Sequence, residues 1–195
     1  MKELDNSERI RYSATIHSQL EERMRSHEPT PATRCRAVYA GSFDPLTNGH
    51  AWLIAQAARA FDLTVAVATN AAKRPMFTTE ERVGIVRATV ADLTNITVNI
   101  LPPDEFLARF ARSVDAQFLI RGIRNVADLE AERAMQEVNR QQFGIETLFF
   151  LGPSEVLNIS SSFVRGFLGL QGWEEIVRTM VPAATLDALR QKVAP

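Results

Sequence analysis

The sequence predicts an α/β protein in which helices cover both faces of a parallel sheet of five strands. Two observations predict this fold class. From residue 36 onward, short apolar runs alternate with segments of helical periodicity, an order typical of parallel sheets with crossover helices. The runs are apolar at nearly every position, which indicates strands buried on both faces. The expected architecture is therefore a doubly wound α/β fold.

The predicted strands are the apolar runs themselves. The first run ends at Gly41, and the second is rich in β-branched residues, which favour strands. Pro102 and Pro103 stop the third run, because proline lacks the N–H that a sheet ladder needs. Strands are expected at residues 37–40, 63–68, 96–101, 118–120 and 147–151.

Helices are predicted in the intervals between the strands. Thr78 and Glu81 stand at the N-cap and N3 positions of a capping box, which marks the start of one of them. Glycine and proline interrupt the helical pattern after Ser160, near residues 166, 172 and 182. Helices are expected at residues 52–61, 79–91, 104–113 and 126–142, and in the segments after Ser160.

The first 35 residues differ in pattern from the rest of the chain. Ile10, Ile16, Leu20 and Met24 recur at helical spacing, and a stretch with two prolines follows them. We predict an N-terminal appendage over residues 1–35, a short amphipathic helix plus linker, and a single domain over residues 36–195. A frayed tail is the alternative interpretation of the appendage.

Composition narrows the class of protein. The 22 basic and 23 acidic side chains leave a net charge of −1, which argues against a nucleic-acid coat or a polybasic membrane anchor. The lone Cys35 excludes an internal disulfide and fits a reducing compartment. The polar N-terminus and the absence of an apolar run of roughly 18 residues predict neither a signal peptide nor a membrane span. A cytoplasmic protein without nucleic-acid or membrane partners is expected.

Residues 41–50 follow the first predicted strand and carry the strongest chemical signal. Ligands of parallel α/β sheets bind outside the carboxyl ends of the strands. Gly41 allows close approach of the backbone to a ligand, and Gly49 allows the chain to turn into a helix. His50 falls on the first turn of that helix, where N–H groups and the helix dipole favour a phosphate. The imidazole is therefore a candidate donor to a phosphate oxygen, and a structural histidine is the alternative.

Cations follow two other predicted strands. Lys73 and Arg74 come after the second, and Arg121 and Arg124 flank a glycine directly after the fourth. A guanidinium at a sheet edge can grip a phosphate with two hydrogen bonds. The alternative for Lys73 and Arg74 is a solvated surface pair. The alternative for Arg121 and Arg124 is a structural salt bridge.

A serine run, residues 160–162, precedes a predicted helix. It is either an ordinary N-cap or a nest of hydroxyl and N–H groups for a triphosphate. The sequence contains neither a P-loop nor the dinucleotide-binding glycine fingerprint, and it has no zinc-ligand spacing. This set of histidine, cationic, serine and glycine residues suits the binding of phosphates and not acyl transfer.

Taken together, these segments resemble bacterial phosphopantetheine adenylyltransferases. The Thr-x-Gly-His element is shared by a whole nucleotidyltransferase superfamily, whereas the combination with Lys-x-Pro-Met-Phe, Arg-Gly-x-Arg-x-x-x-Asp and Ile-Ser-Ser-Ser is much narrower. The order and spacing agree over nearly all of residues 36–195. The segments that carry the resemblance are residues 41–50, 73–77, 121–124, 139–140 and 159–162.

The resemblance implies a Rossmann-like nucleotidyltransferase fold and a homohexamer. It implies reversible transfer of an adenylyl group from ATP to 4′-phosphopantetheine, which gives dephospho-coenzyme A and pyrophosphate. It also implies Mg²⁺ as cofactor, held mainly by phosphates and water, with no protein metal ligands.

The resemblance implies a role for each matching position. The catalytic residues would be His50, Lys73 and Arg121. The acceptor would be bound by Ser42, Lys73, Leu107 and Arg121. The nucleotide would be bound by Ser42, Phe43, His50, Gly122, Ile123, Arg124, Glu132, Val156, Leu157, Asn158, Ile159, Ser160, Ser161 and Ser162.

The sequence departs from the family pattern in places. The family usually lacks the N-terminal appendage, and the nucleotide loop at residues 154–158 is one residue shorter and has no aromatic side chain. Three alternatives therefore stand beside the implied reaction. They are a related nucleotidyltransferase with another phosphorylated acceptor or CTP, a non-catalytic nucleotide or coenzyme A binding protein, and a fold whose cations are only structural.

Overall fold

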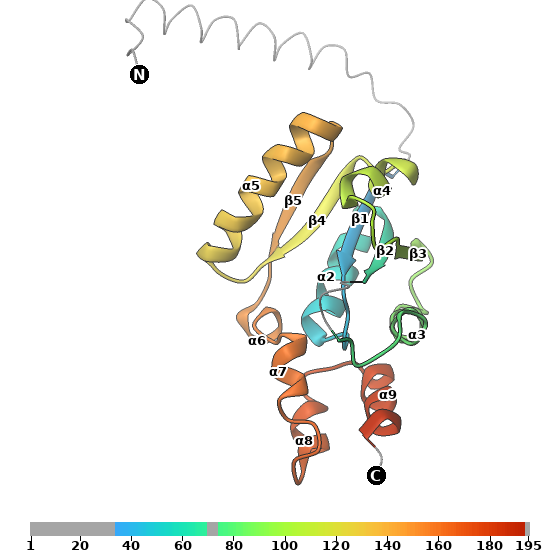
Figure 1. The fold of residues 1–195 in the computed structure, drawn as a ribbon, viewed down its shortest axis with the longest axis vertical. Helices are drawn as coiled ribbons and strands as arrows, with labels where there is room; N and C mark the ends of the chain where they lie inside the picture. Colours follow the sequence, from blue (N-terminus) through green and yellow to red (C-terminus); the bar gives the residue numbers. More distant parts are fainter. Residues whose placement is uncertain (1–33, 70–73, 194–195) are drawn as a thin grey trace, which may run out of the picture. The chain divides into compact units, whose positions relative to one another are not determined.

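A five-stranded parallel sheet forms the centre of the molecule (Figure 1). The computed structural model describes residues 34–69 and 74–193, so the predicted appendage helix and Lys73 lie outside the described residues. The strand order β3-β2-β1-β4-β5 confirms the predicted doubly wound fold. The strands are β1 (Arg36–Gly41), β2 (Asp62–Ala68), β3 (Ile96–Leu101), β4 (Phe118–Ile123) and β5 (Glu146–Leu151).

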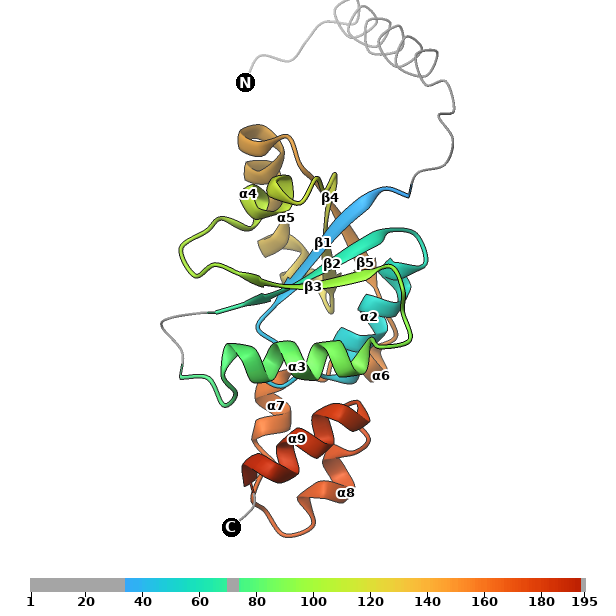
Figure 2. The same cartoon turned by 90° about the vertical axis from the view of Figure 1, so that its right-hand side faces the viewer.

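Helices lie on both faces of this sheet, as the apolar strands predict (Figure 2). Residues that alternate along β1 enter two separate cores. Ala37 and Tyr39 pack in the core that includes residues of α2 (Asn48–Ala58) and α3 (Thr79–Thr89). Val38 and Ala40 pack in the core that includes residues of α4 (Leu107–Ser113). The sheet is therefore covered on both faces, with α5 (Val126–Phe143) on the side of α4.

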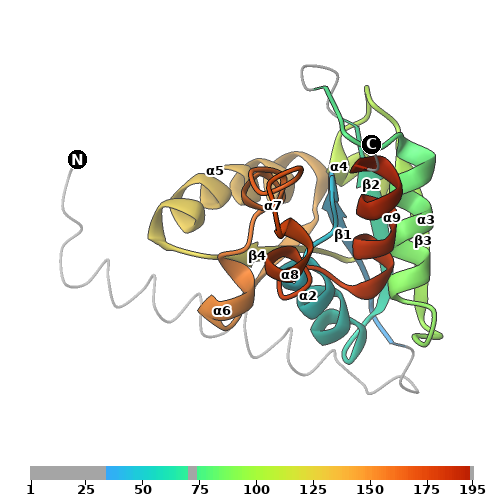
Figure 3. The same ribbon diagram turned by 90° about the horizontal axis from the view of Figure 1, so that it is seen from below.

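The C-terminal helices extend the core on the side of α2 and α3 (Figure 3). Val164, Val177 and Leu189 are fully buried there. These helices are α6 (Ser154–Leu157), α7 (Ser161–Arg165), α8 (Trp173–Val177) and α9 (Ala183–Val193). Within the described parts of the chain, no helix is long and apolar enough to cross a membrane.

Apart from shifts of one or two residues at element ends, four elements differ from the sequence prediction. The helix expected at residues 52–61 is α2, which begins at Asn48, after its N-cap Thr47, and ends at Ala58. The helix expected from Asp104 begins at Leu107, because the chain first turns after Pro103 and the Phe106 backbone is extended. The short α6 occupies the segment expected as a loop. β4 continues through Ile123 instead of ending at Ile120, because Arg121 and Gly122 still pair with Phe149 and Phe150 of β5.

The continuation of β4 opens a crevice in the sheet. β1 pairs with β4 only over Ala37–Tyr39, and the strand order reverses between these two strands. Beyond Tyr39 and Ile120 the two strands pair only with their outer neighbours, β2 and β5. A reversal of this kind is where doubly wound folds bind ligands.

Candidate active site

A cavity of about 510 Å³ lies at this crevice between β1 and β4. Its walls come from the end of β1, the start of α2, the end of β4, one face of α5 and the serine run at the start of α7. It is lined by Tyr39, Ala40, Gly41, Ser42, Thr47, Gly49, His50, Leu53, Arg121, Gly122, Arg124, Asp128, Glu132, Ile159, Ser160, Ser161 and Ser162. The cavity therefore brings together most of the site residues expected from the sequence, from segments more than 100 positions apart.

The cap of α2 fixes the His50 side chain. Thr47 is the N-cap residue, and its backbone N–H donates to Nδ1 of His50 at 3.0 Å. Because Nδ1 accepts this hydrogen bond, the proton of the neutral ring must be on Nε2. Burial, together with the Arg124 guanidinium, lowers the pKa of His50 to about 4. At neutral pH the cavity thus contains an uncharged imidazole with a single N–H to donate.

Phe43 supports this imidazole from behind. Its fully buried ring makes edge-to-face contacts with the rings of His50 and Tyr39, at centroid distances of 5.2 and 5.6 Å. The Phe43 backbone is left-handed, with φ of 48°, a conformation that costs a non-glycine residue about 1–2 kcal/mol. Gly41 makes room for the ring, since a Cβ atom there would lie 2.8 Å from Cε1 of Phe43. The loop is thus held in a conformation that packs an aromatic ring under the site.

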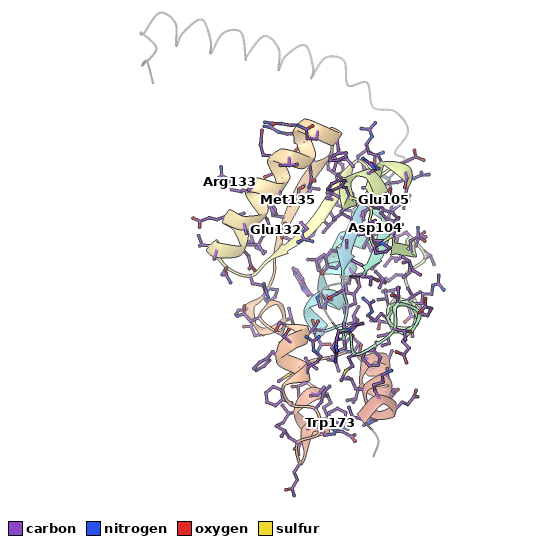
Figure 4. The ribbon with its side chains drawn as sticks, viewed as in Figure 1. Asp104, Glu105, Glu132, Arg133, Met135 and Trp173 are labelled. Atoms are coloured by element: carbon purple, nitrogen blue, oxygen red, sulfur yellow. The ribbon has the colours of Figure 1, made fainter. Side chains whose placement is uncertain are left out.

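Arg121 lines the cavity from β4 and forms a two-pronged ion pair with Glu132 of α5. Nε donates to Glu132 Oε2 at 2.9 Å, and Nη2 donates to Oε1. Figure 4 shows Glu132 on the side of α5 that faces β4. The structural salt bridge considered from the sequence is therefore present. Both partners remain partly exposed and line the cavity.

Arg124 forms a similar pair one turn away, with Asp128. Nε and Nη2 donate to the carboxylate at 2.7 and 3.1 Å, and this hydrogen bonding holds the pKa of Asp128 below its usual value. Asp128 was not expected among the site residues. Arg124 precedes α5, and the signal in the sequence is the Arg-Gly-x-Arg-x-x-x-Asp pattern, which ends at Asp128.

Each hydroxyl of the serine run has a partner within the protein. Ser160 is the N-cap of α7 and accepts from the N–H of Phe163 at 3.1 Å, which confirms the N-cap interpretation for this residue. Ser161 donates to the Pro45 carbonyl at 2.8 Å, and Ser162 accepts from Arg165. The run also lines the cavity. It therefore links α7 to the loop that carries His50.

Several expected site residues lie away from the cavity walls or outside the described residues. Phe43 and Ile123 are buried in the core, so their side chains do not line the cavity. Leu107, Val156 and Asn158 are not part of its lining either. Lys73 and the side chain of Leu157 lie outside the described residues.

Tyr39, Thr47 and Leu53 also line the cavity and were not expected. Tyr39 and Leu53 lie at apolar positions whose patterns carry no signal of a binding site, whereas Thr47 belongs to the Thr-x-Gly-His element. Burial raises the pKa of Tyr39, so its phenol stays protonated at neutral pH. Tyr39 therefore contributes a neutral side chain to the lining of a cavity that also contains imidazole, guanidinium, carboxylate and hydroxyl groups.

Known proteins are similar to this chain in sequence and in fold. The cytidylyltransferase-like family model matches residues 38–167. The phosphopantetheine adenylyltransferase of Chromobacterium violaceum is 43% identical over 149 residues, which cover 75% of this chain and 90% of the relative. The enzyme of that name from Neisseria meningitidis is 40% identical over 161 residues, or 82% of this chain and 94% of the relative.

A solved structure supports the fold at a greater distance. The nicotinic acid mononucleotide adenylyltransferase of Plasmodium falciparum superposes with a TM-score of 0.59 at 15% identity, covering 82% of this chain and 96% of the other. Identity this low supports only the fold. The sequence relatives, matched over most of their length, are more specific: this chain belongs to the phosphopantetheine adenylyltransferase family.

Proposed function

We propose that this chain transfers the adenylyl group of ATP to 4′-phosphopantetheine, giving dephospho-coenzyme A and pyrophosphate. The observation that carries the proposal is the single cavity in which His50, Arg121 and Arg124 meet the serine run. Membership of the phosphopantetheine adenylyltransferase family supports the choice of both substrates.

The chemistry needs positioning more than it needs a base. An oxygen of the acceptor phosphate attacks the α-phosphorus of ATP, a new P–O bond forms, and the bond to the β-phosphate oxygen breaks. A phosphate monoester is largely ionised near neutral pH, so no side chain has to remove a proton. The obstacle is repulsion between two anions, about 4 kcal/mol per pair of unit charges at 4 Å and an effective dielectric of 20.

Cations of the cavity would offset that repulsion. Arg121 and Lys73 would hold the acceptor phosphate, and Arg124 would hold the nucleotide. Each arginine would either bind the phosphate and its carboxylate partner together or release the carboxylate to bind the phosphate. Both arginines line the cavity, Arg121 from within β4 and Arg124 from the position directly after the strand. This arrangement suits the in-line approach that phosphoryl and nucleotidyl transfer require.

His50 would stabilise the charge that develops on the α-phosphate. Its Nε2–H is the ring's free donor, because Nδ1 is occupied by the Thr47 N–H. A donor that is fixed before the substrate arrives needs no reorganisation during the reaction. The low pKa of about 4 keeps the imidazole neutral, so it acts as a hydrogen-bond donor and not as a proton source.

We propose that Mg²⁺ enters with the nucleotide. Within residues 34–69 and 74–193, no group of three or more His, Cys, Asp or Glu is placed to hold a metal ion. Mg²⁺ commonly retains several waters and binds substrate phosphates. The ion would then be held by ATP and water, as part of the substrate.

We further propose a cytoplasmic homohexamer in which residues 1–35 form an appendage to the domain 36–195. The family model begins at residue 38, which supports this boundary. The exposed side chains of Met135 and Val138 on α5, at 57% and 49%, support a subunit contact at this helix. The single cysteine suits a reducing compartment.

Pyrophosphate release tests the reaction. The full chain is incubated with ATP and Mg²⁺, with and without 4′-phosphopantetheine, and we expect release only with both substrates. Parallel samples replace ATP with CTP, because the matching family model is described as cytidylyltransferase-like. A higher kcat/KM with CTP would contradict the nucleotide assignment, and tight ATP binding without release would identify a non-catalytic binding protein.

A further inference from the structure

Arg82 is the one arginine of the core in the described parts of the chain. Arg82 lies on α3, is only 2% exposed to solvent, and does not line the cavity. A buried guanidinium is costly unless its charge and its N–H groups are satisfied. Its position therefore calls for an explanation beyond packing.

Every N–H of the Arg82 guanidinium has an acceptor. Nε donates to the Thr78 carbonyl at 3.3 Å, and Nη1 donates to the carbonyls of Ser42 and Ala68, both at 2.7 Å. Nη2 donates to the hydroxyls of Thr69 and Thr79, at 3.4 and 3.0 Å. A guanidinium has five donors in a rigid fork, so these contacts fix it in one orientation. All the acceptors are neutral, and the positive charge is not cancelled by any of them.

The two shortest hydrogen bonds join the loop after β1 to the end of β2. Ser42 lines the cavity, and Ala68 ends β2, just before the segment that contains Lys73. The other end of that segment is also tied to the first loop. The buried Asp44 carboxylate accepts from the N–H groups of Met76 and Phe77, both at 2.9 Å. Arg82 and Asp44 thus tie Ala68, Met76 and Phe77 to the loop of residues 41–50.

We propose that Arg82 is a positioning residue for nucleotidyl transfer, which aligns the Ser42 loop with the end of β2 and places a fixed positive charge behind the Ser42 carbonyl. The inference rests on the proposed function. It explains why a cation is buried among carbonyl groups: the charge lies behind a loop whose other side faces the proposed phosphate site. The anionic substrates would supply the compensation that the neutral acceptors do not.

Arginine variants of the full chain test the role. Arg82→Met removes the charge and all five donors, and Arg82→Lys keeps the charge but cannot join both carbonyls and both hydroxyls. Arg87→Met is the matched control, because Arg87 lies on the same helix and also donates to a strand carbonyl, that of Val98, away from the cavity. Each variant is assayed for kcat and for both KM values at a temperature where circular dichroism shows it to be folded.

Folded Arg82→Met is expected to lose about 100-fold in kcat, as a misplacement of roughly 1 Å can cause. Its KM for ATP should rise by a smaller factor than kcat falls, because Arg124 and the serine run, which also face the nucleotide, lie on other elements. Arg82→Lys should recover part of the loss, and Arg87→Met should keep the wild-type kcat. Wild-type kcat in folded Arg82→Met, or an equal loss in Arg87→Met, would overturn the proposal.

Hydrogen–deuterium exchange separates this proposal from the proposed function. Arg82→Met or, should it not fold, Arg82→Lys is expected to exchange faster than wild type in peptides covering residues 41–50 and 74–78, while Arg87→Met is not. This measurement needs no turnover, so it remains decisive even if the wild-type chain releases no pyrophosphate. Unchanged exchange in both peptides would refute the positioning role.

Discussion

At position 50, a helix cap determines which nitrogen of the imidazole is available to a substrate. The sequence predicts that His50 lies on the first turn of a helix, since two glycines and a buried strand precede it. It does not predict the tautomer, which depends on the 3.0 Å contact between the Thr47 N–H and Nδ1. Neither the buried Arg82 nor the pairing of Arg121 with Glu132 is visible in local patterns. They arise from residues brought together by the fold.

His50→Ala tests the role of the imidazole. We expect kcat to fall by about 10²–10³-fold, the effect of removing one donor to a developing anion, while the Kd for ATP stays close to wild type. The measurements are steady-state kinetics and isothermal titration calorimetry. His27→Ala, in the predicted appendage, serves as the matched control. Equal losses of ATP binding and turnover would contradict a role in the transition state.

Protonation of His50 should also be visible in stability. Its pKa is about 4 in the folded protein, against an ordinary value of 6.5, so between these pH values the unfolded chain binds more protons. The free energy of unfolding should therefore fall as the pH is lowered from 6.5 towards 4. Urea titrations at several pH values would show a smaller fall for His50→Gln. A parallel pH dependence in the two proteins would contradict the low pKa.

At the scale of elements, the strand centres could be predicted because burial on both faces requires continuous apolar runs. The end of β4 could not, because Arg121 and Gly122 resemble loop residues although they pair with β5. Both β1 and β4 approach the site through a glycine. A Cβ atom on Gly122 would lie 2.6 Å from Leu53 Cδ1, and one on Gly41 would meet the Phe43 ring. Close packing of strand ends therefore shapes the cavity.

Gly41→Ala is expected to destabilise the protein by about 1–3 kcal/mol, as overpacking of a core does, and to lower kcat by moving the Phe43 ring under His50. Gly84→Ala is the matched control, since a Cβ atom there has no neighbour within 4 Å and Gly84 lies inside α3. The free energy of unfolding of Gly84→Ala should be about 0.5–1 kcal/mol higher than that of the wild type. Chemical denaturation and kinetics would measure both variants. A Gly41→Ala variant with wild-type stability and wild-type kcat would contradict this explanation of the packing.

For the whole molecule, the convergence of distant segments was predictable from topology. Parallel strands bring their carboxyl ends to one edge, so the loops after Gly41 and Ile120 had to meet if the order was doubly wound. The walls contributed by Tyr39 and Asp128 required the actual packing of strands and of α5. The site is therefore predictable in outline and not in its hydrogen bonds.

The assembly proposed for α5 can be tested by sedimentation velocity. The wild-type chain is expected to sediment as a hexamer and Val138→Glu as smaller species, because a charge at an apolar contact is costly to bury. Arg133→Gln, on the same helix, serves as the control and should remain hexameric. A monomeric wild-type chain, or no change in Val138→Glu, would contradict this contact.

The reverse reaction tests the central claim, that one cavity holds both anionic reactants, most directly. The full chain is given dephospho-coenzyme A, pyrophosphate and Mg²⁺, and ATP formation is measured for the wild type and for His50→Ala. We expect ATP to appear in equal amount with 4′-phosphopantetheine, and His50→Ala to form ATP about 10²–10³-fold more slowly than the wild type. An absence of ATP, or a wild-type rate of ATP formation in His50→Ala, would contradict the account.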